Sequence, residues 1–233
     1  MREAFAFLTV VGRSAPPTPR ALRWFPVVGA AVGALVGGVW WLADQAFPAL
    51  LAAVLVVAVD LAVTGGLHAD GLVDAADGLL PHATRERRLE IMRTPDVGAF
   101  GAATLGVVLL ARVGAFAARP ADVGLVVALW CTARTVVAVA PAVLPYARDE
   151  GLASALIATP VSALTALALL PAAALAVVTV GWVGGAAVGA AVLGAVAVLL
   201  LARRRVGGFT GDVLGAAIVV AETVGLVVAG ARW

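Results

Sequence analysis

The stretch GGLHADGLVDAADGLLPHATRERRLEIMRTPDVGAFG, residues 65–101, is a polar island in an apolar chain. It carries both histidines, six of the fourteen acidic residues and four of the sixteen arginines. Within it, Asp70, Asp74 and Asp77 are spaced i, i+4, i+7, which places three carboxylates within roughly 60° on one face of an α-helix. Like charges at this spacing destabilise a helix unless they are solvated or share a cation. We favour a site for Mg²⁺, which takes carboxylates and substrate phosphate oxygens as ligands.

The composition is that of a membrane protein. The chain has 233 residues, of which 63% are hydrophobic and 13% charged, and its mean hydropathy is +1.06. Soluble domains are about half apolar and about a quarter charged. We therefore predict an all-α, polytopic membrane helix bundle that forms a single integral membrane domain over residues 1–233. The small net charge of +2 gives no basis for binding nucleic acid.

About seven transmembrane spans are expected from the length of the apolar segments. The predicted spans are 26–42, 49–63, 99–118, 123–144, two within 152–202 that divide near Gly181, and 213–230. With a cytoplasmic N-terminus, twelve of the sixteen arginines fall on the cytoplasmic side, as the positive-inside rule requires. This orientation predicts a multi-pass protein of the plasma (inner) membrane whose polar segment, residues 64–98, faces the cytoplasm.

The polar island is expected to form two short helices. Pro81 disfavours a helical conformation at the preceding residue and ends the first helix, which carries the aspartates. Thr84 is a suitable N-cap for the second helix, and Leu89 and Met92 would pack that helix inward.

Arginines of the second helix have two interpretations. Arg85 and Arg88 could hold phosphate groups through bidentate hydrogen bonds. Alternatively, they pair with Glu86 and Glu90 as surface ion pairs.

Four ionisable residues lie inside predicted spans: Asp60, Arg112, Arg134 and Glu222. Such residues are costly in a membrane and are candidates for function. We expect Asp60 to neutralise one of the arginines as a buried pair and Glu222 to belong to the site. Glu222 follows Asp212 on one predicted helix, behind a turn with glycines at 207, 208 and 211, where backbone can approach a ligand closely.

Several familiar sites are excluded by spacing. Gly65 and Gly66 belong to neither a Walker nor a dinucleotide-binding motif. His68 and His82 are far apart in sequence and the neighbouring ligands are hard oxygens, so zinc is discounted. Carboxylates for Mg²⁺ and arginines for phosphates on a membrane bundle indicate a phosphotransferase, because phosphoryl transfer needs mainly positioning and charge neutralisation.

The run GGLHADGLVDAADGL, residues 65–79, resembles the signature of the cobalamin synthase family, the adenosylcobinamide-GDP ribazoletransferases. Agreement extends to WFPVVGAAVG from Trp24, to YARDEGL from Tyr146 and to GGFTGDVLGA from Gly207. The resemblance implies the joining of adenosylcobinamide-GDP and α-ribazole, or α-ribazole 5′-phosphate, with release of GMP. It leaves open a homo-oligomer and contacts with other corrinoid enzymes.

The site residues inferred with this resemblance fall into three groups. Mg²⁺ would be held by Asp70, Asp74, Asp77 and Glu222. The catalytic residues would be Asp74, Asp77 and His68, the last as a base. Substrate would contact Gly65, Gly66, Arg85, Arg88, Arg93, Arg148 and Asp212.

Two other functions fit the sequence less well. A CDP-alcohol phosphotransferase pattern begins Asp-x-x-Asp-Gly, which Asp74, Asp77 and Gly78 satisfy, but Pro81 and His82 stand where Ala-Arg should follow. An ion-coupled transporter could use intramembrane acids as proton carriers, but the internal repeat common to such folds is not evident.

Overall fold

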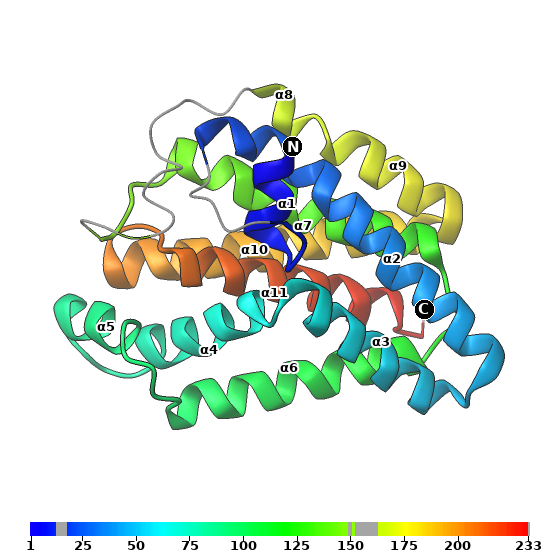
Figure 1. The fold of residues 1–233 in the computed structure, drawn as a ribbon, viewed down its shortest axis with the longest axis horizontal. Coiled ribbons are helices and arrows are strands. Elements are labelled where there is room, and N and C mark those ends of the chain that lie inside the picture. Colours follow the sequence, from blue (N-terminus) through cyan, green and yellow to red (C-terminus); the bar gives the residue numbers. More distant parts are fainter. Residues whose placement is uncertain (13–17, 149–150, 152–162, 233) are drawn as a thin grey trace.

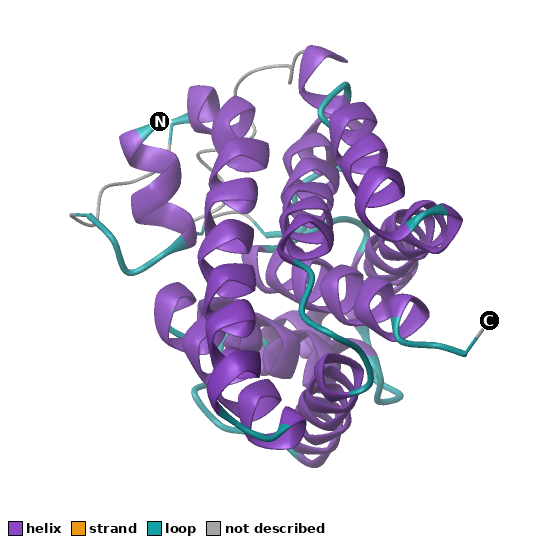
Figure 2. Ribbon diagram, turned by 90° about the vertical axis from the view of Figure 1, so that its right-hand side faces the viewer, coloured by secondary structure: helices purple, strands orange, loops and turns teal. Residues whose placement is uncertain are grey.

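In the computed structural model, the described residues 1–12, 18–148, 151 and 163–232 form a bundle of helices without β-strands (Figures 1 and 2). The helices are α1 (Arg2–Leu8), η1 (Pro19–Trp24), α2 (Phe25–Ala46), α3 (Ala49–Thr64), α4 (Leu67–Leu79), α5 (Arg85–Ile91), α6 (Ala99–Ala117), α7 (Val123–Val143), α8 (Ala163–Ala166), α9 (Leu169–Val180), α10 (Trp182–Val206) and α11 (Gly211–Ala229). The all-α prediction is confirmed.

Five of the described helices are long and apolar enough to cross a membrane: α2, α6, α7, α10 and α11. Helices α3 and α4 meet this test only as a pair, which bends by 90°, and would make six. The prediction of seven spans is therefore not confirmed. The shorter apolar helix Leu164–Val180 lies where the fifth span was expected, and residues 152–162 of that predicted span lie outside the described residues.

Helix boundaries follow the local signals in the sequence. Pro26 lies in the first turn of α2, where a missing N–H group costs nothing. Gly181, with φ of 71°, ends α9 and begins α10, as expected. In the island, α4 ends before Pro81, and the Thr84 side chain accepts a hydrogen bond from the N–H of Arg87 at the start of α5.

The helices of the core approach one another through small residues. On α2, Gly29, Gly33 and Gly37 recur every four residues along the face that packs on α7, and a Cβ atom on Gly33 would lie 2.8 Å from Val127 Cα. Such close backbone approach is the usual basis of helix association in membranes, where lipid offers no hydrophobic driving force. Larger side chains at these positions would separate the two helices.

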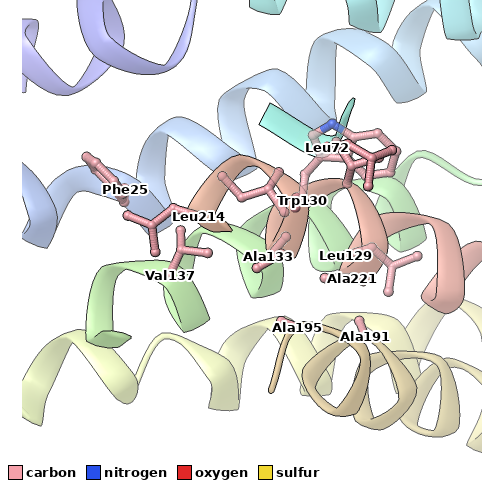
Figure 3. Packing of buried hydrophobic residues seen from close by; sticks show 14 of the residues in the cluster. Phe25, Leu72, Leu129, Trp130, Ala133, Val137, Ala191, Ala195, Leu214 and Ala221 are labelled. Carbon is pink, nitrogen blue, oxygen red and sulfur yellow. The ribbon is translucent and has the colours of Figure 1, made fainter. Parts of the chain in front are cut away.

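Helix α7 lies at the centre of the core. Figure 3 shows Leu129 of α7 beside Ala221 of α11, with Ala191 of α10 below them. Leu129, Trp130 and Ala191 are fully buried. Helices α10 and α11 thus pack against the same central helix, and α11 fixes the place of α4.

The break between α3 and α4 is built by two glycines. Gly65 and Gly66 have φ of 61° and 69°, a left-handed conformation that other residues adopt only with strain. The N–H of Gly66 donates to the Leu61 carbonyl (2.8 Å) and that of Gly65 to the Ala62 carbonyl (3.2 Å), which is the Schellman ending of a helix. The break turns the chain by 90° into α4.

Helix α4, predicted as the first of two short helices in the polar segment, packs against α11 and α6 of the bundle. A Cβ atom on Gly71 would lie 3.1 Å from the Asp212 Cα atom, so α4 crosses the first turn of α11 at close range. A Cβ atom on Gly215, one turn further along α11, would lie 3.4 Å from His68 Cα. The two helices are therefore antiparallel at the crossing, and α4 carries its aspartates beside the start of α11 (left in Figure 1).

The left-handed break can be tested with Gly66→Ala. Neither Gly66 nor Gly38, which lies within α2, has a neighbouring atom within 4 Å of an added Cβ, so the two substitutions differ mainly in backbone conformation. We expect Gly66→Ala to destabilise the fold by about 1–2 kcal/mol and Gly38→Ala to stabilise it by about 0.5–1 kcal/mol. Thermal unfolding of the detergent-solubilised variants measures both, and equal shifts would contradict the assignment.

Candidate active site on helix α4

Asp77 holds the start of helix α6. Its side chain is buried, and its two carboxylate oxygens accept hydrogen bonds from the N–H groups of Gly98 (2.8 Å) and Gly101 (2.9 Å). These are free donors in the first turn of a helix, where a negative charge is also favoured by the helix dipole. Asp77, predicted as a metal ligand and catalytic residue, thus has a structural task that sequence spacing did not reveal.

Asp70 and Asp74 lie on the same side of α4 with greater access to solvent. Asp70 is exposed and Asp74 half-buried. Asp74 is close enough to Asp70, Asp77 and Asp212 to interact with the charge of each. The crossing of α4 with α11 therefore adds a carboxylate that is distant in sequence to the acidic face.

Asp212 is oriented by two hydrogen bonds. Its Oδ2 atom lies 2.7 Å from Nη2 of Arg148 and accepts a hydrogen bond from the Thr210 hydroxyl at 3.3 Å. Thr210 is the N-cap of α11 and accepts from the N–H of Val213. Nη2 of Arg148 also donates to the Met92 carbonyl at 3.1 Å. Arg148 thereby joins the end of α5 to the start of α11 beside the aspartates.

The glycine-rich turn before α11 contacts backbone and not an open space for a ligand. The N–H of Phe209 donates to the Pro145 carbonyl (3.0 Å), and the N–H of Ala147 donates to the Phe209 carbonyl (2.9 Å). A Cβ atom on Gly208 would collide with the Pro145 carbonyl oxygen. The backbone of this turn does approach another group closely, as the glycines suggested. That group is the segment from Pro145 to Ala147, which precedes Arg148, and not a ligand.

Arg88, predicted either to hold phosphate or to pair with a glutamate, bonds backbone carbonyls in this structure. It is buried, its Nη1 donates to the carbonyls of Gly78 (2.9 Å) and Leu79 (2.7 Å), and its Nε donates to that of Ala83 (3.1 Å). The bonds to Gly78 and Leu79 satisfy carbonyls that the end of α4 leaves without helical partners. Burial lowers the pKa of its guanidinium.

The other arginines of the island differ in whether their guanidinium groups are already hydrogen-bonded within the protein. Arg85 donates to the carbonyls of Val206 (2.9 Å) and Ala147 (3.0 Å) and so links α5 to the end of α10. Arg93 is exposed and close enough to Tyr146 to act on its phenol: burial raises the pKa of Tyr146, whereas the charges of Arg148 and Arg93 lower it. The predicted ion pairing of Arg85 with the glutamates is replaced by a pair between Arg87 and Glu90.

A buried ion cluster lies deeper in the bundle. Arg112 of α6 bonds Asp60 of α3 at 3.0 Å and Glu222 of α11 at 2.8 Å, and Arg134 of α7 also bonds Glu222. Trp130 Nε1 donates to Asp60 at 2.9 Å, a contact that no sequence pattern indicated. The pairing of Asp60 with an arginine is confirmed.

Glu222 is committed to this cluster. It is 1% exposed and pairs with two arginines. Ten residues of helix separate it from Asp212, which is about 15 Å along α11. The structure therefore does not place Glu222 with the aspartates of α4 as a metal ligand. His68 also faces inward, 5% exposed, so a base there would be remote from the solvent-accessible carboxylates.

Among the residues that the structure describes, no three Asp, Glu, His or Cys side chains already stand close enough to hold a metal ion. Gly65 and Gly66, predicted to contact substrate, form the break before α4. The arrangement that remains is a group of carboxylates from two helices, with Arg148 bound to one of them and Arg93 close to Tyr146.

The sequence model of the cobalamin-5-phosphate synthase family matches residues 1–230. Similar proteins named adenosylcobinamide-GDP ribazoletransferase occur in Chlorobium phaeobacteroides and Chlorobium chlorochromatii. The first is 37% identical over 227 residues, covering 90% of this chain and 87% of that protein. The second is 38% identical over 221 residues, covering 90% and 85%. No solved structure is significantly similar to the chain.

The ion cluster predicts that Glu222 stabilises the fold. This role can be tested by measuring stability alone, without a metal or substrate. Glu222→Gln leaves a buried arginine charge without its partner, which costs about 3–5 kcal/mol. Glu86→Gln, at an exposed position of α5, is the matched control and should change stability by less than about 0.5 kcal/mol. Thermal unfolding in detergent measures both. A Glu222→Gln variant as stable as the wild type would contradict this role.

Proposed function

Because this chain belongs to the cobalamin-5-phosphate synthase family, we propose that Asp70, Asp74 and Asp212 hold Mg²⁺ for its reaction. The chain is a transferase of the last nucleotide-loop assembly step of cobalamin biosynthesis, and adenosylcobinamide-GDP is a substrate. The match over nearly the whole chain does not favour a CDP-alcohol phosphotransferase or a transporter. The metal, the acceptor and the orientation in the membrane belong to the proposal.

The observation that supports the metal is the grouping of carboxylates at the crossing of α4 and α11. Asp74 interacts with the charges of Asp70 and Asp212, and within the described part of the chain their one ion pair is that of Asp212 with Arg148. Hard oxygen ligands with access to water suit Mg²⁺, which keeps several waters and binds substrate phosphates. Because no trio of such ligands stands ready among the described residues, the proposal requires these carboxylate side chains to rearrange around the ion.

Asp77 and Glu222 are left out of this ligand set. Both oxygens of Asp77 already accept hydrogen bonds from the first turn of α6, and Glu222 neutralises arginines in the core. Asp212 takes their place because it is the carboxylate that the fold brings to Asp74.

In the proposed reaction, a free ribose hydroxyl of α-ribazole, or of α-ribazole 5′-phosphate, whose 5′-oxygen is already esterified, attacks the phosphorus attached to cobinamide. The new oxygen–phosphorus bond forms, the bond to GMP breaks, and the hydroxyl proton is released. Mg²⁺ supplies charge neutralisation at the diphosphate. Arg93 is exposed and available to bind phosphate oxygens, while Arg148 holds Asp212 and Arg85 holds the segment around Ala147.

The proposed location is the inner membrane with this site toward the cytoplasm. Helix α5, the end of α10 and the start of α11 lie at one end of the bundle (Figure 1). Arginines 85, 87, 88, 93, 148, 203, 204 and 205 belong to that end. Helices α6 and α11 lead away from it to Arg119 and Arg232. This imbalance supports a cytoplasmic site under the positive-inside rule.

Asp74→Asn tests the assignment. Loss of a ligand charge should lower the formation of adenosylcobalamin and GMP about 100-fold or more, with thermal stability retained because Asp74 makes no structural hydrogen bond among the described residues. Asp96→Asn, an exposed acid of the same segment, is the control and should keep activity.

The assay uses purified protein in detergent with adenosylcobinamide-GDP, α-ribazole and Mg²⁺, and products are separated by chromatography. EDTA should stop turnover and added Mg²⁺ should restore it. Normal GMP release from Asp74→Asn, or turnover that EDTA leaves unchanged, would refute the metal assignment.

A further inference from the structure

A small cavity lies between α3, α4, α6 and α11, beneath the face of α4 that points away from the aspartates. Its polar lining consists of Asp60, Thr64, His68, Arg112 and Glu222. Apolar side chains from all four helices, among them Leu105 and Leu109 of α6, form the rest of the lining. The cavity therefore joins the buried ion cluster to the helix that carries the proposed metal site.

Among the polar atoms of the lining residues, Glu222 Oε1 is in an ion pair with Arg134, and two other atoms have neither a hydrogen bond nor an ion pair among the described residues. They are Nε2 of His68 and Nε of Arg112, from side chains that are 5% and 2% exposed. Leaving such an atom unsatisfied costs about 1–3 kcal/mol, so buried polar groups are almost always paired with protein or with ordered water. One residue comes from α4 and the other from α6.

We propose that the cavity binds one ordered water molecule that bridges these two atoms. The cavity is polar and has room for about one water, which are the two conditions for a buried water site. The water accepts a hydrogen bond from the Nε–H of Arg112 and donates one to Nε2 of His68. This requires the neutral imidazole that carries its proton on Nδ1.

The bridge makes His68 a positioning residue and not the base expected from sequence. His68 lies roughly 120–180° around α4 from Asp70, Asp74 and Asp77, so it cannot share their face. Through the water it ties α4 to Arg112, which the ion pairs with Asp60 and Glu222 hold in place. The position of α4 relative to α11, and with it that of Asp74 relative to Asp212, then depends on this link.

The expected effect of His68 on turnover depends on the proposed metal site. The proposal of a bound water does not depend on that site. His68→Leu removes the acceptor, and because small displacements of reacting groups are costly, it should lower turnover about 10- to 100-fold. His68→Gln keeps a polar atom near the place of Nε2 and should restore turnover to within about threefold of wild type. His82→Gln, at the exposed second histidine, is the control and should match wild type.

Rescue by glutamine separates positioning from catalysis, because glutamine cannot act as a general base. If His68→Gln were as inactive as His68→Leu, the positioning role would be overturned. The water is tested separately by cryo-electron microscopy of the wild-type protein in lipid nanodiscs at a resolution that shows ordered water. Density bonded to both His68 Nε2 and Arg112 Nε is expected, and a dry cavity or one filled by a side chain would overturn the site even if the metal proposal fails.

Discussion

The fold depends on the neutralisation of two arginines inside an apolar bundle. Arg112 and Arg134 are both nearly inaccessible to solvent, and an unpaired charge there would be costly. Asp60 and Glu222 balance them, and because the four residues come from α3, α6, α7 and α11, pairing the charges also fixes the helices. In the arrangement that pairs these four charges, α4 also crosses the first turn of α11.

The residues of the acidic motif have different roles, some structural and some proposed for metal binding. Asp77 faces α6 and caps its first turn, Asp70 and Asp74 face solvent and α11, and His68 faces the cavity. Asp74 and Asp77 are one helical turn apart but have different roles, because α4 packs against both α11 and α6. In sequence the motif resembles one set of metal ligands. In the structure its residues face α6, α11 and the cavity.

The sequence predicted what depends on local signals. Pro81, Thr84 and Gly181 marked helix ends because proline, N-cap and left-handed conformations are properties of the residue itself. What it could not predict are the partners across the bundle. In the sequence, Arg88 and Arg93 are both arginines of the polar island and cannot be told apart. In the structure, the guanidinium of Arg88 donates hydrogen bonds to the carbonyls at the end of α4. Glu222 and Asp212 share one helix, but only the fold shows that they serve different clusters.

The binding of a divalent cation at the crossing of α4 and α11 is the central claim, and it can be measured without turnover. Mn²⁺, which substitutes for Mg²⁺ at oxygen sites, is detected by electron paramagnetic resonance in the purified protein. We predict one Mn²⁺ per chain that Mg²⁺ displaces, with binding weakened in Asp70→Asn and Asp212→Asn but kept in Asp96→Asn. Equal Mn²⁺ binding by all of these proteins, or none by the wild type, would contradict the account.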